Sequence, residues 1–265
     1  MNLPPIGLGT FRLEGQQAIA SVGAALDIGY RLIDTAQMYN NEAEVGRALA
    51  ASRVPRSEVF VTTKIWPDNF TRLIPSLKES LERLQMQQVD LTLLHWPAPG
   101  SGVPLEHTLA ALMEARAAGL TRQIGLSNFN IALMTRAIAI AGKGQIATNQ
   151  VELSPYLHNL KVADFASGEG IRITSYMTLA RGLVLDDRTL GKIAQRHGAT
   201  TAQVALAWAM RLGHTVIPSS TQPANLQSNF EALKLSLSEA DMAQIARLDK
   251  GTRLVDPAGL RPEWD

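Results

Sequence analysis

The amino-acid sequence predicts an α/β fold, a single (β/α)8 barrel over residues 1–265 with an active site at the C-terminal ends of its strands. The chain has 265 residues, close to the roughly 250 of a typical barrel of this kind. Apolar strand-like runs alternate with helical patterns from end to end, without a long linker. Three successive runs each end near a titratable side chain, as expected where parallel strands converge on one face.

The strand-like runs are short, rich in Val, Ile, Leu and Thr, and bounded by turn residues. Strands are therefore expected near 6–10, 30–34, 59–64, 89–95, 122–127, 146–151, 171–176 and 214–218.

Longer helical patterns fill the intervals between these runs. Helices are expected near 15–28, 42–52, 71–85, 105–118, 130–141, 159–168, 186–211 and 223–232. A further helix is expected near 238–248, because Ser238 and Asp241 have the spacing of a capping box.

A doubly wound parallel sheet is the alternative arrangement of the same elements. Such a sheet usually carries a glycine-rich dinucleotide fingerprint after a strand. The nearest candidate here is Gly7-Leu8-Gly9, and no third glycine follows at the required position. The barrel is therefore the favoured fold.

Composition narrows the function classes. Hydrophobic residues make up 46% of the chain and charged residues 18%, the formal net charge is +1, and no basic stripe indicates nucleic-acid binding. No apolar run approaches the roughly 20 residues of a membrane span, and MNLPPIGLG lacks the features of a secretory signal. Without cysteines there can be no disulfide, thiolate metal site or cysteine nucleophile, and no histidine pair or carboxylate cluster suggests another metal site. A cytoplasmic enzyme without a metal is expected.

Four polar residues form the candidate reactive constellation. Asp34 and Tyr39 lie in LIDTAQMYNNE (32–42), Lys64 closes VFVTTK (59–64), and His95 closes LTLLH (91–95). An ammonium beside a phenol lowers the phenol's pKa, and a carboxylate keeps that ammonium charged. A neutral imidazole can donate a hydrogen bond to a carbonyl oxygen. Together these groups could polarise and protonate a carbonyl, which is half of a reduction. The hydride must come from a nicotinamide cofactor.

Each of these residues taken singly has an ordinary structural interpretation. Asp34 could cap a turn, Tyr39 could be a loop aromatic, Lys64 could be solvated, and His95 could be a packed histidine. Four fitting residue types at successive strand ends favour a joint catalytic function. Two alternatives remain, namely a Schiff-base lyase with Lys64 as nucleophile and a non-catalytic nicotinamide-binding or partner-binding protein.

Several motifs, in order along the whole chain, resemble the aldo-keto reductase family. They are GLGTFRL (7–13), LIDTAQMYNNE (32–42), VTTKIW (61–66), VDLTLLHWP (89–97), IGLSNF (124–129), NQVELSPY (149–156) and VIPSST (216–221). TSYMTLARG (174–182) and the terminal PEWD (262–265) are similar to a branch of bacterial diketogluconate reductases with compact loops. The resemblance implies a barrel that uses NADPH to reduce aldehydes and ketones.

The resemblance also implies roles for individual residues. Tyr39 would be the general acid, Lys64 and Asp34 would tune it, and His95 would orient the carbonyl. Ser127, Asn128 and Gln150 would bind the nicotinamide carboxamide, and Tyr176 would stack on the ring. The remaining cofactor residues would be Thr10, Asp34, Met177, Leu179, Arg181, Pro218, Ser219, Ser220, Thr221, Asn225, Ser228 and Asn229. The substrate would meet Tyr39, Trp66, His95 and Trp96.

The adenosine end of the cofactor site departs from the family pattern. Family members commonly carry P-K-S where this chain has Pro218-Ser219-Ser220, and often an arginine where Asn225 stands. No Lys or Arg occurs between Arg211 and Lys234, so a 2′-phosphate would lose its usual cationic partners. Neutral donors at the start of a helix could partly replace them. NADPH is expected from family habit, and NADH use stays open.

The surroundings of the site suggest the substrate class. Short loops imply an open mouth, so small polar carbonyls such as methylglyoxal or 2,5-diketo-D-gluconate are expected. The loop over 97–104 follows His95 directly and should border the site. The tail, 251–265, has no clear periodicity and is either a frayed end or a flap over the barrel mouth. The resemblance suggests a monomer.

Overall fold

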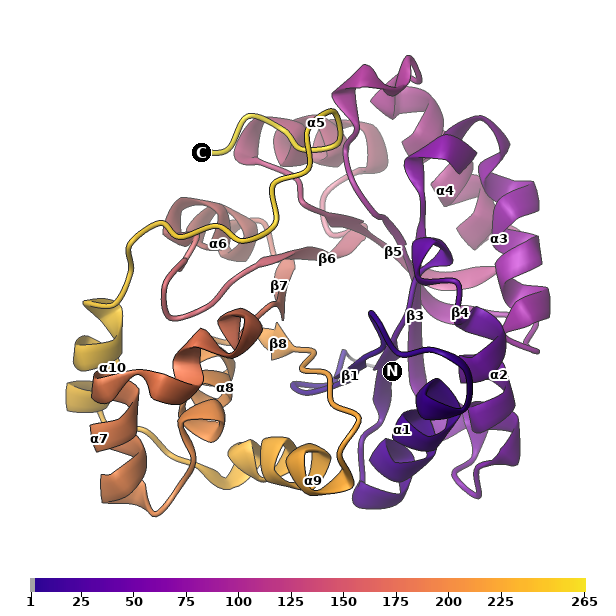
Figure 1. The fold of residues 1–265 in the computed structure, drawn as a ribbon. Coiled ribbons are helices and arrows are strands. Elements are labelled where there is room, and N and C mark those ends of the chain that lie inside the picture. The colour runs from indigo at the N-terminus through magenta and orange to yellow at the C-terminus, as the bar shows by residue number, and fades with distance from the viewer. Residues whose placement is uncertain (1–2) are drawn as a thin grey trace.

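The protein is described here from a computed structural model, which covers residues 3–265. Eight parallel strands form one sheet in the order β1-β2-β3-β4-β5-β6-β7-β8. Their bounds are β1 Leu8–Gly9, β2 Leu32–Asp34, β3 Phe60–Ile65, β4 Val89–Leu94, β5 Thr121–Ser127, β6 Ile146–Glu152, β7 Arg172–Tyr176 and β8 Thr215–Val216. Helices surround the strands on the outside (Figure 1), so the predicted (β/α)8 barrel is confirmed.

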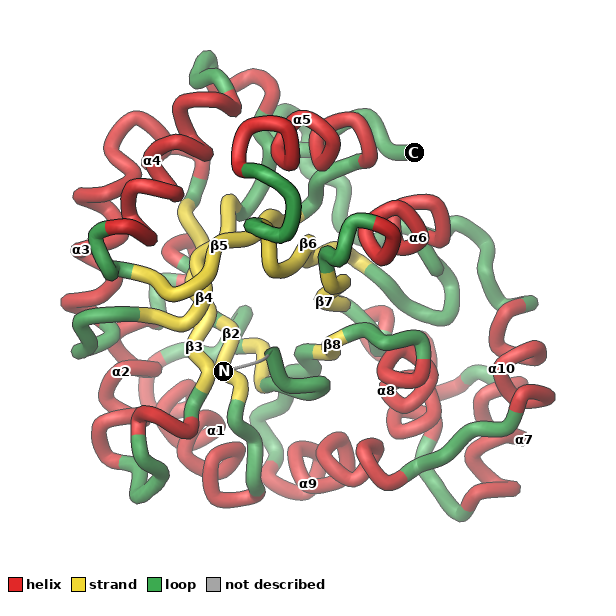
Figure 2. Tube along the Cα trace, turned by 180° about the vertical axis from the view of Figure 1, so that it is seen from behind, coloured by secondary structure: helices red, strands yellow, loops and turns green. Residues whose placement is uncertain are grey.

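One α-helix follows each of β1 to β6, and two follow each of β7 and β8. They are α1 Gly15–Ile28, α2 Glu42–Ala51, α3 Leu73–Arg83, α4 Leu105–Ala117, α5 Ile131–Ala141, α6 Leu160–Gly168, α7 Arg188–His197, α8 Thr201–Arg211, α9 Pro223–Glu231 and α10 Glu239–Ala246. Short 3-10 helices occupy η1 Gln37–Tyr39, η2 Arg56–Glu58, η3 Pro67–Arg72, η4 Pro99–Ser101, η5 Ala180–Asp186 and η6 Ala232–Lys234. Seen from behind, the strands form a ring inside the helices (Figure 2).

The first and last strands meet to close the barrel. Gly7 N donates to Val216 O at 2.8 Å, and Gly9 N donates to Pro218 O at 3.1 Å. A Cβ at Gly9 would lie 2.6 Å from Ile217 O, so a side chain there would push the two segments apart. The glycines of the Gly7-Leu8-Gly9 segment therefore serve strand packing, which agrees with the weak fingerprint signal.

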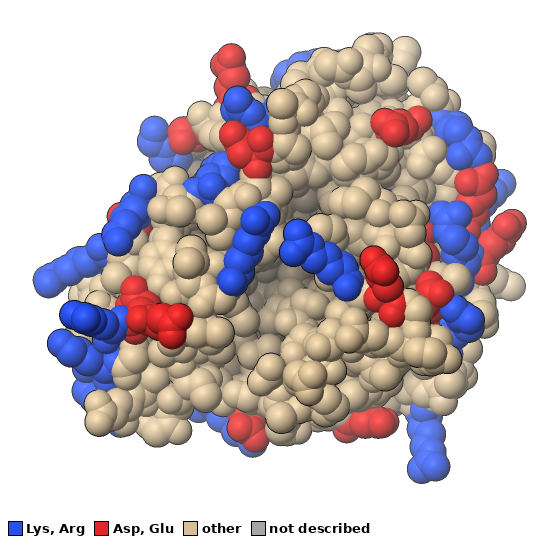
Figure 3. Space-filling view, viewed as in Figure 1, with Lys and Arg blue, Asp and Glu red and all other residues tan. Residues whose placement is uncertain are grey.

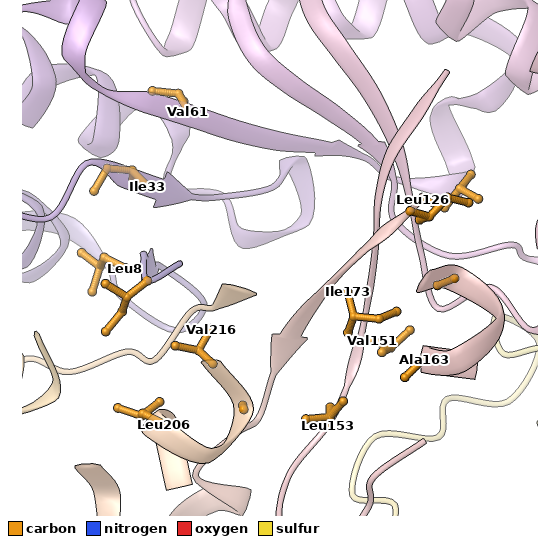
Figure 4. Close-up of a cluster of buried hydrophobic side chains, with 14 of the residues drawn as sticks. Leu8, Ile33, Val61, Leu126, Val151, Leu153, Ala163, Ile173, Leu206 and Val216 are labelled. Carbon is orange, nitrogen blue, oxygen red and sulfur yellow. The ribbon is translucent and has the colours of Figure 1, made fainter. Parts of the chain in front are cut away.

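Alternation along the strands sends side chains to two different layers. Leu8, Ile33, Val61 and Val216 belong to the large hydrophobic cluster, which also includes residues of the helices such as Leu206 of α8 (Figure 4). A second cluster contains Leu32, Phe60, Leu91, Leu93 and Ile217. The second cluster fills the barrel interior beneath the polar residues at the strand ends.

The register between strands places the polar residues above this interior cluster. Phe60 and Lys64 lie on the same face of β3 because they are four residues apart in a structure with a side-chain period of two. Lys64 pairs with Leu93 of β4, and Asp34 of β2 pairs with Thr62 of β3. Lys64 thus points into the barrel, where its side chain is 0% exposed.

One predicted helix is wrong in its extent. The pattern over 186–211 is two helices, α7 and α8, separated by three residues. Gly198 ends α7 in the left-handed region at φ 61°, and Thr200 forms a capping box with Gln203 at the start of α8. The capping box predicted from Ser238 and Asp241 is present at α10.

The first and last strands are shorter than predicted. β1 and β8 have two residues each, although the sequence predicts strands over 6–10 and 214–218. Ile6 still pairs with Val216 in an isolated parallel bridge, so the ring of strands remains continuous. Across residues 3–265, none of the helices is both long and apolar enough to cross a membrane. Two residues of the MNLPPIGLG stretch, Met1 and Asn2, lie outside the described residues.

Two helical glycines give a matched test of packing in the outer ring. A Cβ at Gly46 of α2 would lie 2.6 Å from Arg83 O and 2.7 Å from the carbonyl carbon of Leu84, whereas a Cβ at Gly23 of α1 would have no neighbour within 4 Å. Gly46→Ala should therefore lower the free energy of unfolding by about 1–3 kcal/mol. Gly23→Ala should raise it by about 0.5–1 kcal/mol, because alanine favours the helix. Urea unfolding measures both; equal effects of the two substitutions would contradict the packing argument.

Candidate active site

The four residues predicted to react come together at one end of the barrel. Asp34 is the last residue of β2, Lys64 is the penultimate residue of β3, and His95 follows β4 directly. Tyr39 closes the 3-10 turn η1 on the loop after β2. The space-filling view shows a hollow near the centre of one face, with Lys and Arg side chains on its rim (Figure 3).

Lys64 is the hub of this group. Its ammonium donates to Asp34 Oδ1 at 2.5 Å, to Thr35 O at 2.9 Å and to Tyr39 Oη at 3.0 Å. An ammonium has three N–H donors, and these three acceptors satisfy all of them. Asp34 is 2% exposed, and its second carboxylate oxygen accepts from Gln150 Nε2 at 2.8 Å.

Burial and charge act against each other on the pKa values of this group. Burial alone would lower the pKa of Lys64, but the charges and hydrogen bonds of Asp34 and Tyr39 outweigh it, so this pKa is raised and the amine stays protonated. Burial raises the pKa of Tyr39, and the Lys64 ammonium opposes that rise without cancelling it. The expected lowering by Lys64 is therefore present, but burial, which the sequence pattern does not reveal, has the larger effect on the pKa of Tyr39.

His95 is held as a neutral imidazole. Burial, followed by the positive charge of Lys64, lowers its pKa well below the usual value. The His95 ring is nearly perpendicular to the rings of Tyr39 and Trp66, with centroid distances of 5.7 Å and 5.2 Å. Its Nδ1 atom is buried and has no partner among the described residues.

Amide and hydroxyl groups at the ends of β5, β6 and β7 form a second layer beside this group. Asn128 Nδ2 donates to His95 O at 3.0 Å, and Tyr176 Oη donates to Asn128 Oδ1 at 2.7 Å. Ser127 Oγ donates to Gln150 O at 2.9 Å. Since Gln150 also reaches Asp34, the predicted carboxamide-binding residues adjoin the predicted acid site.

The remaining predicted cofactor residues lie along the loops after β1, β7 and β8. Thr10 Oγ1 donates to Asp34 O at 3.0 Å, which links it to the reactive group. Met177 and Arg181 have positive φ angles, 55° and 53°, and Leu179 precedes η5. Strained backbone of this kind is common at ligand sites. The predicted adenosine-end residues occupy the loop after β8 and helix α9, namely Pro218, Ser219, Ser220, Thr221, Asn225, Ser228 and Asn229.

The two predicted tryptophans of the substrate wall occupy different settings. Trp66 contacts His95 and is partly exposed. Trp96 is 5% exposed, and its ring packs edge-on against Trp264 of the tail at 6.5 Å. A surface hollow of about 400 Å³ also adjoins Tyr39 and is lined by Phe11, Arg12 and Met38 among others. Trp66 therefore contacts the reactive group directly, and the role of Trp96 at the substrate wall stays a prediction.

The tail is bound across the loops at the mouth. Leu254 N and Val255 N donate to the carboxylate of Glu152, at 2.7 Å and 2.8 Å. Farther along, Leu260 O accepts from Ala98 N, and Glu263 O accepts from Asn130 Nδ2. The tail is therefore bound to the loops after β4, β5 and β6 and is not a frayed end, and its role as a flap stays a prediction.

Some residues that shape the site were not singled out from the sequence. Gln37 and Asn41 lie on either side of Tyr39, and their buried amides bind neighbouring loops. Glu152 lies two residues after Gln150 on β6, so strand alternation places both on one face. Glu152 could have been found from this alternation. Gln37 could have been found from its position within LIDTAQMYNNE. No group of three metal-binding side chains occurs within residues 3–265.

Comparisons with known proteins agree on one family. The model of the Aldo/keto reductase family matches residues 5–250. The chain is 57% identical over 267 aligned positions to the methylglyoxal reductase DkgB of Salmonella typhi, covering 100% of both chains. It is 41% identical over 254 positions to an aldo-keto reductase of Mycobacterium sp. (strain MCS), covering 95% of this chain and 89% of the other.

Solved structures resemble the whole fold. One, provisionally described as a 2,5-diketo-D-gluconic acid reductase B, has a TM-score of 0.96 and 43% identity, covering 99% of this chain and 94% of that chain. The aldose reductase of Schistosoma japonicum has a TM-score of 0.92 and 29% identity, covering 98% and 93%.

The buried ion pair between Lys64 and Asp34 should show strong energetic coupling. Lys64→Met leaves the Asp34 carboxylate without its cation, and the free energy of unfolding should fall by about 3–5 kcal/mol. In the Lys64→Met background, Asp34→Asn should lower the free energy of unfolding much less than it does in the native protein, since no charge then remains unpaired. Urea unfolding of the two single variants and the double variant gives the coupling free energy, expected at roughly 0.5–3 kcal/mol. Additive costs would show that the pair does not act as a unit.

Proposed function

Because this chain belongs to the aldo/keto reductase family, we propose that it reduces small, polar aldehydes and ketones to alcohols with Tyr39 as the proton donor. Family membership makes the protein an oxidoreductase that acts on carbonyl groups. The assignment of residues, cofactor and substrate is our proposal. The observation that carries it is the 3.0 Å hydrogen bond from Lys64 Nζ to Tyr39 Oη.

The direction of that hydrogen bond determines what Tyr39 can do. Since the phenolic oxygen accepts from Lys64, its own proton is left to donate to a carbonyl oxygen. The raised pKa of Tyr39 keeps this proton in place until negative charge develops on the substrate. The adjacent ammonium then stabilises the phenolate that proton donation leaves behind. Tyr39 therefore acts as a general acid, and Lys64 supports it by charge.

His95 has a separate role in this proposal. A neutral imidazole carries one N–H donor, and the lowered pKa of His95 keeps it neutral near pH 7. A charged imidazolium beside Lys64 would be opposed by the nearby ammonium and by burial. His95 would therefore orient the carbonyl oxygen toward Tyr39 by a hydrogen bond, without competing as the acid.

The residues beside Asp34 fit a nicotinamide. A carboxamide needs both donors and acceptors, and Ser127, Asn128 and Gln150 offer both within one layer. Tyr176 offers an aromatic ring held by its hydrogen bond to Asn128. When bound, the cofactor supplies the hydride that no side chain can provide. Binding there would require Asn128 and Gln150 to exchange part of their present hydrogen bonding.

We propose NADPH as the cofactor, with NADH accepted as well. The usual cofactor preference of the family supports NADPH. The adenosine end lacks the cations that favour its 2′-phosphate, because no Lys or Arg lies between Arg211 and Lys234. Helix α9 begins there after Gln222, and helix N-termini attract anions only weakly when exposed. Discrimination between the two cofactors should therefore be modest.

The substrate proposal rests on relatives and on the loops. The names of similar proteins refer to methylglyoxal and to 2,5-diketo-D-gluconic acid, and we propose that this protein takes compounds of that size. Trp66 would form the apolar part of the wall beside His95. We propose a cytoplasmic monomer, as the family resemblance suggests.

A Schiff-base mechanism is less compatible with the site. A nucleophilic amine must be neutral, whereas Asp34 and Tyr39 raise the pKa of Lys64. All three ammonium hydrogens also have acceptors. Lys64 is therefore better suited to stabilise charge than to attack a carbonyl.

Removing one hydroxyl tests the proposed acid. Tyr39→Phe should lower kcat for carbonyl reduction by roughly 10²–10⁴-fold, because proton donation is lost while the ring is kept. NADPH binding, followed by quenching of tryptophan fluorescence, should change by less than about threefold, since the hydroxyl adjoins the carbonyl rather than the dinucleotide. Turnover that stays near the native rate would refute the assignment of Tyr39.

A gain-of-function variant tests the adenosine end. Asn225→Arg should tighten NADPH binding roughly tenfold or more, because a guanidinium forms charge-assisted hydrogen bonds with a phosphate. NADH lacks that phosphate, so its Kd serves as the control and should stay nearly unchanged. If fluorescence titration shows equal changes for both cofactors, Asn225 does not face the 2′-position.

A further inference from the structure

We propose that Gln37 is a positioning residue for carbonyl reduction. Its buried amide fixes the turn that carries Tyr39 relative to the segment that carries Trp66, so that the acid and the substrate wall keep one relative placement. This inference rests on the proposed role of Tyr39 as the acid. Gln37 itself touches neither the reacting hydroxyl nor the imidazole in any hydrogen bond, and acts through its neighbours.

The hydrogen bonds of the Gln37 amide are complete. Its oxygen accepts from Trp66 N at 2.9 Å and from Asn69 Nδ2 at 3.0 Å. Its nitrogen donates to Ser76 O and to Ser80 Oγ, both at 3.1 Å. An amide has two acceptor positions and two donor hydrogens, and all four are used. The residue is only 9% exposed, so losing a partner would leave a buried polar group unpaired.

The orientation of this amide is fixed by its partners. Trp66 N is a backbone donor, and Ser76 O is a backbone acceptor, so the two cannot exchange roles. Rotating the amide by 180° would place oxygen against oxygen at Ser76 and nitrogen against N–H at Trp66. Gln37 can therefore occupy this pocket in one way, which gives the turn a definite position against β3 and α3.

The two segments joined by Gln37 both reach the reactive group. Gln37 begins η1, and Tyr39 ends it. Trp66 follows β3 directly, and its ring meets His95 at 5.2 Å. On the other side of Tyr39, Asn41 Nδ2 donates to Thr10 O and Leu13 O at 2.8 Å. Asn41 thus binds the turn to the loop after β1, while Gln37 binds it to the wall of the substrate site.

Such positioning matters because proton transfer depends steeply on distance. A misplacement of about 1 Å can cost roughly 10²-fold in rate. Lys64 alone fixes one atom of Tyr39, its hydroxyl oxygen, at 3.0 Å. The rings of Phe11 and His95 also lie beside the phenol, with centroids 5.1 Å and 5.7 Å away, but these contacts do not fix the backbone turn that carries Tyr39. The bonds of Gln37 restrict the turn from which the ring extends, and also the Trp66 backbone across from it.

Two substitutions of Gln37 separate positioning from simple stability. Gln37→Met keeps the length and removes all four hydrogen bonds; we expect kcat to fall about 10- to 100-fold, with the Kd for NADPH changed less than about threefold. Leu190→Ala, in the core of the distant helix α7, is the control that lowers stability without touching this network. Both are assayed well below their own unfolding midpoints.

Gln37→Glu gives a pH signature. The introduced carboxyl can donate to Ser76 O only when protonated, and burial raises its pKa. Activity relative to the native protein should therefore be nearly complete at low pH and should fall as the pH rises, roughly between pH 5 and pH 8. Native protein and Leu190→Ala should lack this additional transition. A merely structural loss would follow unfolding of the variant, so activity would fall only at pH values where the unfolding midpoint of Gln37→Glu approaches the assay temperature.

A spectroscopic readout is independent of turnover. The indole N–H signal of Trp66, assigned in two-dimensional NMR by its loss in Trp66→Phe, should shift in Gln37→Met and stay in place in Leu190→Ala. The proposal is overturned if kcat of Gln37→Met stays native, if Leu190→Ala reproduces its loss, or if the Trp66 signal does not move. Failure of the native protein to reduce any carbonyl would instead refute the proposed function, and the NMR comparison would still report on the Gln37 link.

Discussion

A fully buried ammonium is the constraint on which this site depends. Lys64 has no exposure, and removing an ammonium from water costs several kcal/mol even after relaxation. The protein offsets that cost with a carboxylate, a backbone carbonyl and a phenol, one for each hydrogen. Asp34, Thr35 and Tyr39 are thus fixed around one atom. The loop after β2 cannot move far without exposing an unpaired charge.

The same burial gives the titratable groups distinct states. It raises the pKa of Tyr39 and lowers the pKa of His95, so both groups are neutral near pH 7 while Lys64 stays charged. Two groups with the same charge would repel each other strongly in this shared low-dielectric site. One cation, one anion and two neutral hydrogen-bonding groups therefore form a balanced set. Division of roles between acid and orienting group follows from this environment rather than from residue type alone.

The fold and the grouping of the four candidate residues could be predicted because strong local patterns specify them. Strand alternation and length place Asp34, Lys64 and His95 at one rim, and the barrel is confirmed. The sequence predicts one helix across α7 and α8 because the apolar period continues across Gly198, although this glycine and the capping box after it are the local signals of a break. The strands β1 and β8 are shorter than their apolar runs suggest. Two paired residues in each, together with the Ile6–Val216 bridge, are enough to keep the ring of strands continuous.

Other features depend on contacts between distant segments, which no local pattern encodes. Gln37 finds partners up to 43 positions away, and the Glu152 carboxylate accepts from backbone more than 100 positions later. The net pKa of Tyr39 likewise depends on burial by the whole mouth, which composition does not reveal. Sequence motifs thus identify the candidate reactive groups, whereas the folded chain determines how precisely they are held.

In the proposed mechanism, the placement of the reactive groups and the choice of cofactor are controlled in different parts of the molecule. The reactive group is interior, charge-balanced and bound from several strands, so almost any substitution there disturbs several partners. The proposed adenosine end includes exposed neutral residues, namely Ser219 and Thr221 before α9 and Asn225 in its first turn. Exposed substitutions usually alter stability little. A change of dinucleotide preference can therefore arise at α9 without altering the proton-transfer geometry around Lys64, because the two ends share no hydrogen-bonded residue among those described here.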